Sequence, residues 1–564
     1  FCRMKNILSL SHDEALDFLM DSKQYCGFEL PEYFVFNNVL ANVRESIGDK
    51  PYADCVGPVA PDDVDGVNVD VVISKDGKHS IRKLILANPY LYYFLSRELC
   101  NEDSWQALLE CFELFKVPTI TVPSLPVVSE RKEKFHRAST IANWWKCVEQ
   151  RTISLSLDYR YMFVTDITNC YGSINPQSIE WALTRKGTQY ATDKNRELAR
   201  NIQSLLRAMQ HGHNVGIPMG STLFDLVAEI VLGYADLLLY EELTLQGIVN
   251  YEIIRYRDDY RIFCNDKGVL EKISYVLQDV LGSLNFTFNA GKTKITDDVV
   301  TGAIKPDKLW DIYNTPVSSK KKSAFDTIQK HLLYILQFSR QFPNGGQLRT
   351  MLSNLDKMVE ITLSDDIEDE NGDVIEKERP FNCMFAISFG MLKEAGGLGG
   401  CCFRRCLTED VEVLTAIATQ IAVENITVAN YALRLISRLI DSLDTRTKKM
   451  KLVSKVYEKL RNQPNTNYIQ LWLQNLTYVY GQDFDSCGYE TPSYDMPLCG
   501  AMEDEMPVEL WNNSWLKPEL FEADLDASVV DTEVVDKLGP IICFRESQVY
   551  NDIELDPNPF EMID

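Results

Sequence analysis

The sequence contains no run of about 18 or more apolar residues, the length that a membrane-spanning helix needs. Its first 30 residues have the acidic, amphipathic pattern of a helix and lack the basic start and apolar core of a secretion signal. The 15 cysteines show no ligand-like spacing, and the cluster Cys401, Cys402 and Cys406 lacks a second Cys or His pair at zinc-finger distance, which favours structural thiols over a metal site. We therefore expect a soluble, cytoplasmic protein in a reducing compartment, with no membrane partner.

A net positive charge is also missing, since the formal net charge is −25. Residues 481–564 hold 21 Asp and Glu against three basic residues, a net of −18, and residues 364–380 hold eight against two, a net of −6. These two segments account for almost all of the excess. The rest of the chain is close to neutral and has room for a local basic groove that binds a polyanion, whereas the acidic tail would repel or mask such a surface.

The 564 residues are enough for about three or four domains. Residues 1–120 mix short helices with a probable strand, and residues 121–310 contain the alternating strands and helices of an α+β core. Residues 320–480 then have helical periodicity that would suit an α-solenoid, in the segments 324–341, 347–363, 409–423, 427–443 and 446–461. Residues 481–564 predict an acidic, partly extended tail whose deletion leaves the fold intact.

Two adjacent carboxylates, Asp258 and Asp259, lie between two β-rich arms in YEIIRYRDDYRIFC, residues 251–264, which predicts a hairpin with both at its tip. Such a pair is usually only turn chemistry. A third carboxylate, Asp166, ends the apolar strand that contains Met162 and Val164. Because an unpaired buried charge is costly, Asp166 needs either a basic partner or a metal ion shared with the hairpin.

Phosphoryl transfer gives a reason for the three carboxylates to converge. Two Mg²⁺ ions about 4 Å apart activate a hydroxyl and stabilise a leaving pyrophosphate, and Mg²⁺ prefers oxygen ligands. Asp166 and Asp258 would bridge the ions, Asp259 would assist, and the Ile167 carbonyl would complete one shell. Mn²⁺ could substitute for Mg²⁺.

Four motifs follow one another in the order found in the reverse transcriptase family. They are the strand ending at Asp166 with its loop to Tyr171, GIPMGS at residues 216–221, Tyr256-Arg257-Asp258-Asp259, and NFTFNAGKTK at residues 285–294. They resemble motifs A to D of that family. With LPEYFVFNNVL at residues 30–40 and RKLILANPYLYYFL at residues 82–95, the chain is most similar to bacterial abortive-infection and other defence-associated reverse transcriptases. The resemblance implies fingers and palm regions, followed by an all-α, helical-repeat-like domain in place of a thumb.

The resemblance also implies roles for individual residues. Tyr171 would be the steric gate against a 2′-hydroxyl, with packing in the palm as the alternative. The nucleotide would be contacted further by Gly220, Ser221, Lys292, Arg82 and Lys83. For each basic residue a solvated surface position remains open, and Arg131, Lys132, Lys134 and Arg137 are rival triphosphate contacts. His211 and His213 are expected to cap a turn.

Two positions depart from the family pattern. Met219 stands where the family commonly has Gln, and Arg257 stands where a small or apolar residue is frequent. Tyr256 and Arg257 are expected to contact primer or template. Alternatively, Arg257 partly neutralises the metal site.

The leading functional hypothesis is DNA synthesis from deoxynucleoside triphosphates, RNA-templated or untemplated, in bacterial anti-phage defence. The resemblance implies RNA or DNA partners, such as a noncoding RNA template, and a protein partner or homo-oligomer, with a nucleic-acid or tyrosine hydroxyl as primer. A second hypothesis is a catalytically silent palm that acts as a scaffold through the helical domain and tail. A third is a palm-based cyclase, which the motif B and motif D matches disfavour.

Overall fold

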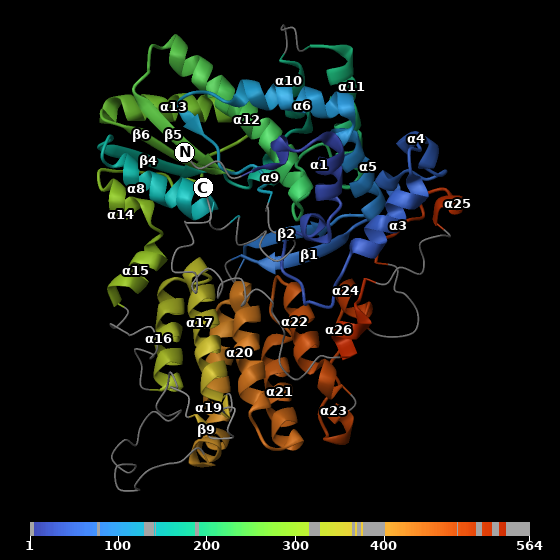
Figure 1. Ribbon diagram of the computed structural model, residues 1–564, viewed down its shortest axis with the longest axis vertical. Helices are drawn as coiled ribbons and strands as arrows, with labels where there is room; N and C mark the ends of the chain where they lie inside the picture. The colour runs from blue at the N-terminus through green and yellow to red at the C-terminus, as the bar shows by residue number, and fades with distance from the viewer. Residues whose placement is uncertain are drawn as a thin grey trace.

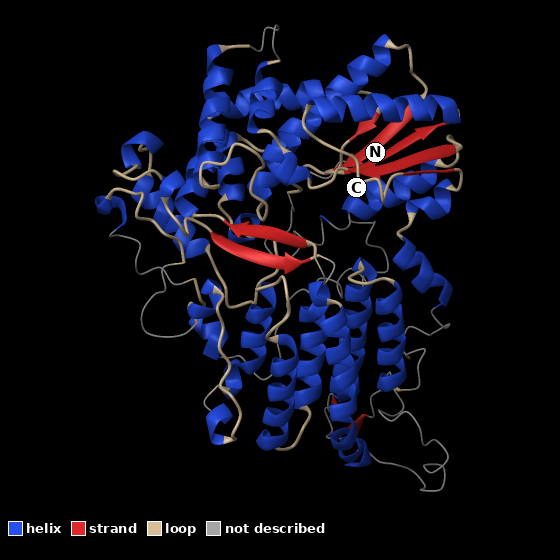
Figure 2. Ribbon diagram, turned by 180° about the vertical axis from the view of Figure 1, so that it is seen from behind, coloured by secondary structure: helices blue, strands red, loops and turns tan. Residues whose placement is uncertain are grey.

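The computed structural model describes residues 5–75, 79–128, 140, 143–185, 191–314, 327–363, 367–368, 374–375, 401–481, 483–502, 510–521 and 529–536, with side chains undescribed for 367–368, 374–375 and 401–410. A five-stranded sheet and its helices form the upper part in Figure 1, and a bundle of helices forms the lower part. A two-stranded sheet lies between them, and both sheets are visible in Figure 2. The predicted α+β core followed by a helical region is confirmed.

The first part of the chain is mostly helical, with one antiparallel hairpin in which Val72 lies opposite Lys83. Its elements are α1 (His12–Leu19), α2 (Ser22–Tyr25), α3 (Asn37–Ile47), α4 (Tyr52–Cys55), β1 (Val69–Ser74), β2 (Ile81–Leu86), α5 (Pro89–Cys100) and α6 (Glu102–Phe115). The predicted capping box of α1 is formed by Ser11 and Glu14.

The central sheet has the strand order β3-β5-β6-β4-β7, with only β3 parallel to its neighbour. Its strands and the helices around it are β3 (Ile120–Thr121), a π-helix (Trp145–Gln150) leading into α8 (Arg151–Leu155), β4 (Tyr161–Asp166), α9 (Cys170–Ser173), α10 (Pro176–Thr184), α11 (Asp193–Ala208), α12 (Thr222–Leu245), β5 (Tyr251–Tyr256), β6 (Asp259–Cys264), α13 (Lys267–Ser283), β7 (Lys294–Thr296), α14 (Val299–Ala303) and α15 (Pro306–Asn314).

Alternating side chains of the strands fill two cores, one on each face of the central sheet. Phe163 and Ile262 belong to the main core on the face covered by α13, with α12 beside it. Met162 and Phe263 belong to a smaller core against α8 and α14, which cover the other face in Figure 1. This alternation fixes the register, because a slip by one residue would exchange the two faces.

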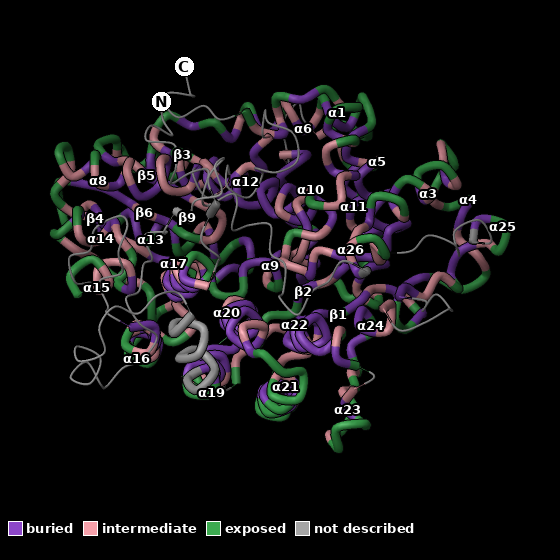
Figure 3. The backbone as a smooth tube through the Cα atoms, turned by 60° about the horizontal axis from the view of Figure 1, so that its bottom comes forward, coloured by how far each residue is buried: buried purple, intermediate pink, exposed green. Residues whose placement is uncertain are grey.

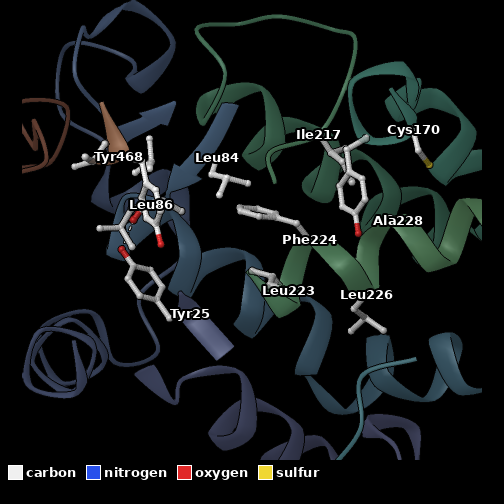
Figure 4. Packing of buried hydrophobic residues seen from close by; sticks show 14 of the residues in the cluster. Tyr25, Leu84, Leu86, Cys170, Ile217, Leu223, Phe224, Leu226, Ala228 and Tyr468 are labelled. Atoms are coloured by element: carbon white, nitrogen blue, oxygen red, sulfur yellow. Dashed lines mark hydrogen bonds between the residues drawn. The ribbon is translucent and has the colours of Figure 1, made fainter. Parts of the chain in front are cut away.

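Helix α12 is the central helix of the upper part. Every residue from Leu226 to Gly233 is buried, as expected for a helix that is apolar all round. The Ser221 hydroxyl caps its first turn by accepting a hydrogen bond from the Phe224 N–H. Figure 4 shows Phe224 pointing from this turn toward Leu84 of β2.

The lower part is a bundle in which α19 packs on α16 and α20, and α20 packs on α17 and α22. Figure 3 shows buried residues concentrated on α20 and α22, whereas α21 has an exposed outer face. The helices are α16 (Ile328–Gln341), α17 (Gly346–Leu363), α19 (Cys401–Glu424), α20 (Ala429–Asp441), α21 (Arg446–Leu460) and α22 (Tyr468–Thr477), with the short strands β8 (Ile367–Glu368) and β9 (Val374–Ile375) after α17. Helices α16, α17, α19, α20 and α21 overlap the five segments predicted from periodicity, and residues 324–326 of the first segment lie outside the described residues.

Among the described residues, no single helix is both long enough and apolar enough to cross a membrane. The segments Val411–Glu424 and Ile426–Asp441 meet the length and composition limits only as a pair that is bent by 115°.

The C-terminal segment corrects one expectation. Its elements are α23 (Asp483–Ser486), α24 (Pro497–Gly500), α25 (Pro518–Phe521) and α26 (Thr532–Asp536). Trp511 and Trp515 are 7% and 0% exposed, and the Trp515 carbonyl accepts a hydrogen bond of 2.6 Å from the Gly57 N–H. Residues 510–521 and 529–536 are therefore docked on the N-terminal region, so deletion of 481–564 would remove part of the core. Residues 537–564 lie outside the described part.

Candidate active site

The end of β4 and the tip of the β5–β6 hairpin lie side by side. Strand β4 pairs with β6 in a register that places Asp166 directly opposite Asp259. One residue further, the Ile167 N–H donates a 3.0 Å hydrogen bond to the Asp258 carbonyl. Because facing residues of antiparallel strands have Cα atoms roughly 4.5–5.5 Å apart, the three predicted carboxylates lie together at one end of the central strands β4 and β6. The Ile167 residue is buried there, 2% exposed.

The hairpin tip is held in an uncommon conformation. Arg257 has a φ of 54°, in the left-handed region that few non-glycine residues occupy. The Arg255 guanidinium donates a 3.2 Å hydrogen bond to the Arg257 carbonyl, which stabilises this turn. The turn thereby places Asp258 and Asp259 at the end of strands β5 and β6.

Lys292 lies against the carboxylates. Its ammonium donates a hydrogen bond to Asp166 Oδ2 and is attracted also by Asp259 and Asp258. The loop that carries it is fixed by the Asn289 N–H, which donates 2.9 Å to the Asp166 carbonyl. Sequence analysis predicted Lys292 near a triphosphate. In the structure described here its partner is Asp166.

The charges of the three carboxylates and Lys292 do not balance. Burial, followed by the charge of Asp258, raises the pKa of Asp259 to about 6, although the Asp259 side chain remains accessible to solvent. Burial, followed among neighbouring charges by Asp166, also raises the pKa of Asp258. Three carboxylates face one lysine, so the site has an excess of negative charge that further cations would neutralise.

The donors suit divalent cations. Within the described part of the chain, no three acidic, His or Cys side chains converge tightly enough to enclose an ion by themselves. However, Asp166 Oδ1 is buried without a hydrogen-bond partner, and carboxylate oxygens are the ligands that Mg²⁺ prefers. Mg²⁺ usually keeps several positions for water and substrate phosphates. The residues therefore fit Mg²⁺ ions whose coordination a bound nucleotide completes.

Tyr171 and Arg257 are both bound to Asp225, a residue that sequence analysis did not select. The Tyr171 hydroxyl donates a 2.6 Å hydrogen bond to Asp225 Oδ1, and the Arg257 guanidinium donates to Asp225 Oδ2. The Arg257 side chain thus pairs with α12, and its charge also acts on Asp258. The two predicted roles of Arg257, a phosphate contact and partial neutralisation of the metal site, stay predictions. Tyr256 lies beside it and lines a cavity of about 50 Å³.

A buried charge network beneath the hairpin was also missed. Arg255, fully buried, donates to Asp236 at 2.7 Å and to Glu229 at 2.9 Å. Glu229 also accepts a 2.7 Å hydrogen bond from the Ser124 hydroxyl. The sequence contains a signal for this network, because Asp225, Glu229 and Asp236 recur on one face of an otherwise apolar helix.

The other predicted nucleotide contacts have structural partners in the described chain. The Ile85 N–H of β2 donates 2.7 Å to the Met219 carbonyl, and the Gly27 N–H donates 2.7 Å to the Gly220 carbonyl. A Cβ on Gly220 would meet the Ile85 carbonyl oxygen at 2.7 Å, and the φ of 139° also requires glycine. Met219 and Gly220 thus hold the motif B loop against β2 and residue 27, and Ser221 caps α12.

The basic residues of β2 are exposed. Lys83 forms a half-exposed ion pair of 2.8 Å with Asp70, and Arg82 is exposed. The rivals Arg131, Lys132, Lys134 and Arg137 lie outside the described residues, as do the side chains of Cys401, Cys402 and Cys406. His211 and His213 lie in the turn after α11, where His211 has a φ of 49°.

Solved structures similar to this chain include telomerases. The telomerase of Candida albicans, in complex with a fragment of telomeric RNA, has 10% sequence identity and a TM-score of 0.27, and the match covers 77% of this chain and 67% of that one. For telomerase from Candida tropicalis, the RNA-fragment complex has 14% identity, a TM-score of 0.28 and coverage of 75% and 68%. The apo form has 10% identity, a TM-score of 0.28 and coverage of 72% and 71%. TM-scores this low carry no information about the substrate of this chain.

The sequence was also compared with protein families and with curated proteins. No curated protein matches it. Residues 119–320 match the family of reverse transcriptases, described as RNA-dependent DNA polymerases. The match includes the whole central sheet, Asp166, Tyr171, the hairpin and Lys292. Residues 119–320 are therefore a reverse transcriptase domain, and the chain is an enzyme of the reverse transcriptase class, a DNA nucleotidyltransferase.

Proposed function

We propose that this chain adds deoxynucleotides to a primer hydroxyl by two-metal phosphoryl transfer, with Asp166, Asp258 and Asp259 as the metal-binding residues. The observation that carries the proposal is the β4–β6 register, which places Asp166 opposite Asp259 with Asp258 in the adjoining turn. The unsatisfied Asp166 Oδ1 supports it, since a cation would satisfy this atom.

In this reaction the side chains bind metal ions, bind phosphate or select the sugar. Asp166, Asp258 and Asp259 would hold two Mg²⁺ or Mn²⁺ ions, which supply activation of the attacking hydroxyl and stabilisation of the leaving pyrophosphate. When divalent cations neutralise the carboxylates, Lys292 leaves Asp166 and binds a phosphate oxygen of the nucleotide instead. Tyr171 lies under the sugar and excludes a 2′-hydroxyl. Arg82 and Lys83 contribute positive charge on β2 at the fingers side.

The test uses purified full-length protein with Mg²⁺ or Mn²⁺ and each labelled deoxynucleotide, with and without RNA templates. Wild type should form high-molecular-weight product, and the double variant Asp258→Ala, Asp259→Ala should form none. The matched control is Asp103→Ala with Asp193→Ala, since these aspartates are 75% and 100% exposed and far from the site in sequence. Small soluble product would instead indicate a cyclase.

We further propose that this activity serves bacterial anti-phage defence, in the cytoplasm and with RNA or DNA bound. The resemblance of the motifs and of residues 30–40 and 82–95 to defence-associated reverse transcriptases supports this role. Phage plating on cells that express wild type or the Asp258→Ala, Asp259→Ala variant tests it. If cells that express the double variant are still protected from phage, and wild-type protein incorporates no nucleotide, the silent scaffold is favoured. Sequencing of copurifying nucleic acid would identify the template or product.

A further inference from the structure

The Asp225 carboxylate lies where the nucleotide end of the site meets the metal-binding hairpin. It belongs to the first turn of α12, and its side chain is 19% exposed. One oxygen accepts a 2.6 Å hydrogen bond from the Tyr171 hydroxyl, and the other pairs with the Arg257 guanidinium. Three segments that are distant in sequence, motif A, motif B and motif C, therefore meet at one side chain.

The Tyr171 contact is buried, whereas the Arg257 side chain is 38% exposed. The Tyr171 residue is 8% exposed, and residues 123–127 line a cavity of about 50 Å³ together with Asp225, Tyr256 and Arg257. That segment is itself held by the N-terminus, since the Ile7 N–H donates 2.9 Å to the Pro126 carbonyl. A partly buried, charge-assisted pair is screened less by salt and water than a surface pair.

We propose that Asp225 is a positioning residue that fixes the Tyr171 ring and holds the Arg257 guanidinium away from the metal-binding carboxylates. This inference rests on the proposed function. A steric gate discriminates only if its ring does not yield to a 2′-hydroxyl, and a hydrogen bond to a fixed carboxylate restrains the ring. Discrimination between deoxyribonucleotides and ribonucleotides therefore depends on Asp225 as well as on the bulk of Tyr171.

The second half of the inference concerns charge. Arg257 immediately precedes Asp258, and its charge acts on Asp258 as well as on its ion-pair partner Asp225. Pairing with Asp225 leaves Asp258 and Asp259 to metal ions. Loss of the Asp225 charge would release Arg257 toward Asp258 and Asp259, where it would compete with divalent cations.

The experiment measures kcat/KM for matched deoxyribonucleotides and ribonucleotides in wild type, Asp225→Asn and Tyr171→Phe. Asp225→Asn should lower the discrimination ratio by about tenfold or more, the change that loss of one hydrogen bond to a charged group supports. It should also raise the Mg²⁺ concentration for half-maximal rate. Tyr171→Phe keeps the ring and loses only the tether, so it should lower the discrimination ratio without changing the Mg²⁺ requirement.

The control is Asp103→Asn, which alters an exposed aspartate that pairs with Lys194. It should leave both readouts unchanged. An unchanged discrimination ratio in Asp225→Asn and Tyr171→Phe, with an active wild type, overturns the inference. If wild type incorporates no nucleotide, the proposed function fails. Hydrogen exchange then tests the contacts of Asp225 with Tyr171 and Arg257 independently of activity. Faster exchange in Asp225→Asn at residues 168–174 and 256–259 supports the positioning role of Asp225, and unchanged exchange overturns it.

Discussion

Replacement of Arg255 tests whether the buried charge network holds the β5–β6 hairpin in place. Arg255, Glu229 and Asp236 are at most 2% exposed. Arg255→Met leaves both carboxylates buried without their cation. Breaking a buried ion pair by removing one partner costs about 3–5 kcal/mol. The same change removes the donor to the Arg257 carbonyl, so the hairpin tip loosens as well.

Hydrogen exchange on β5 and β6 is the suitable assay, because a chain of several regions is not expected to unfold in one step. A loss of 3–5 kcal/mol predicts exchange faster by roughly 10²-fold or more in these strands. The control Arg340→Met breaks an exposed pair with Glu424 of 2.8 Å and should leave exchange in β5 and β6 unchanged, because an exposed pair contributes little to stability.

A rescue variant separates charge from shape. Arg255→Met combined with Glu229→Gln and Asp236→Asn removes all three charges and should recover at least about half of the lost protection, since uncharged replacements of buried ion clusters are often tolerated. Exchange in Arg255→Met that matches the Arg340→Met control, or a triple variant less protected than the single one, would refute the assignment of this energy to the unpaired carboxylates.

Three further predictions concern stability. Trp515→Ala removes a fully buried ring and should cost about 3–5 kcal/mol in the N-terminal region, seen as a lower thermal midpoint; an unchanged midpoint would contradict docking of the C-terminal segment. Burial lowers the pKa of His331 from 6.5 to about 4, so between these values the unfolded chain binds a proton that the folded chain does not. Stability is complete above pH 6.5 and falls by up to roughly 2 kcal/mol by pH 5, and His331→Gln should flatten this slope in urea titrations. Gly220→Ala should reduce folded yield strongly, because its Cβ would meet the Ile85 carbonyl oxygen at 2.7 Å, whereas Gly282→Ala, which meets nothing within 4 Å, should be neutral or slightly stabilising.

The meeting of Asp166 with the hairpin could be predicted because it depends on local patterns. Alternating apolar residues define each strand, and Asp166 and Asp259 stand where those patterns end. Once the strands pair with their apolar faces on the same sides, the register has little freedom. The same reasoning predicted the C-terminal helices from their apolar spacing.

The partners of charged residues inside apolar elements could not be predicted in the same way. The composition of α12 predicts a buried helix, but it does not predict which arginine pairs with Asp225 and which pairs with Glu229. Arg257 and Arg255 both lie in the facing hairpin, and the left-handed turn at Arg257 decides the pairing by directing one side chain to each acid. Likewise, the acidic average of residues 481–564 conceals Trp511 and Trp515, whose burial outweighs the local charge.

The helical region is tied to the polymerase domain through the N-terminal region. Glu29 accepts hydrogen bonds from Asn430 and Tyr431 on its carboxylate and from Tyr468 on its carbonyl. Two residues earlier, Gly27 donates to the Gly220 carbonyl of motif B. A displacement of α20 or α22 would therefore pull on the segment that holds the motif B loop against β2. Hydrogen bonds at residues 27–29 therefore connect the helical region with the loop that opens α12.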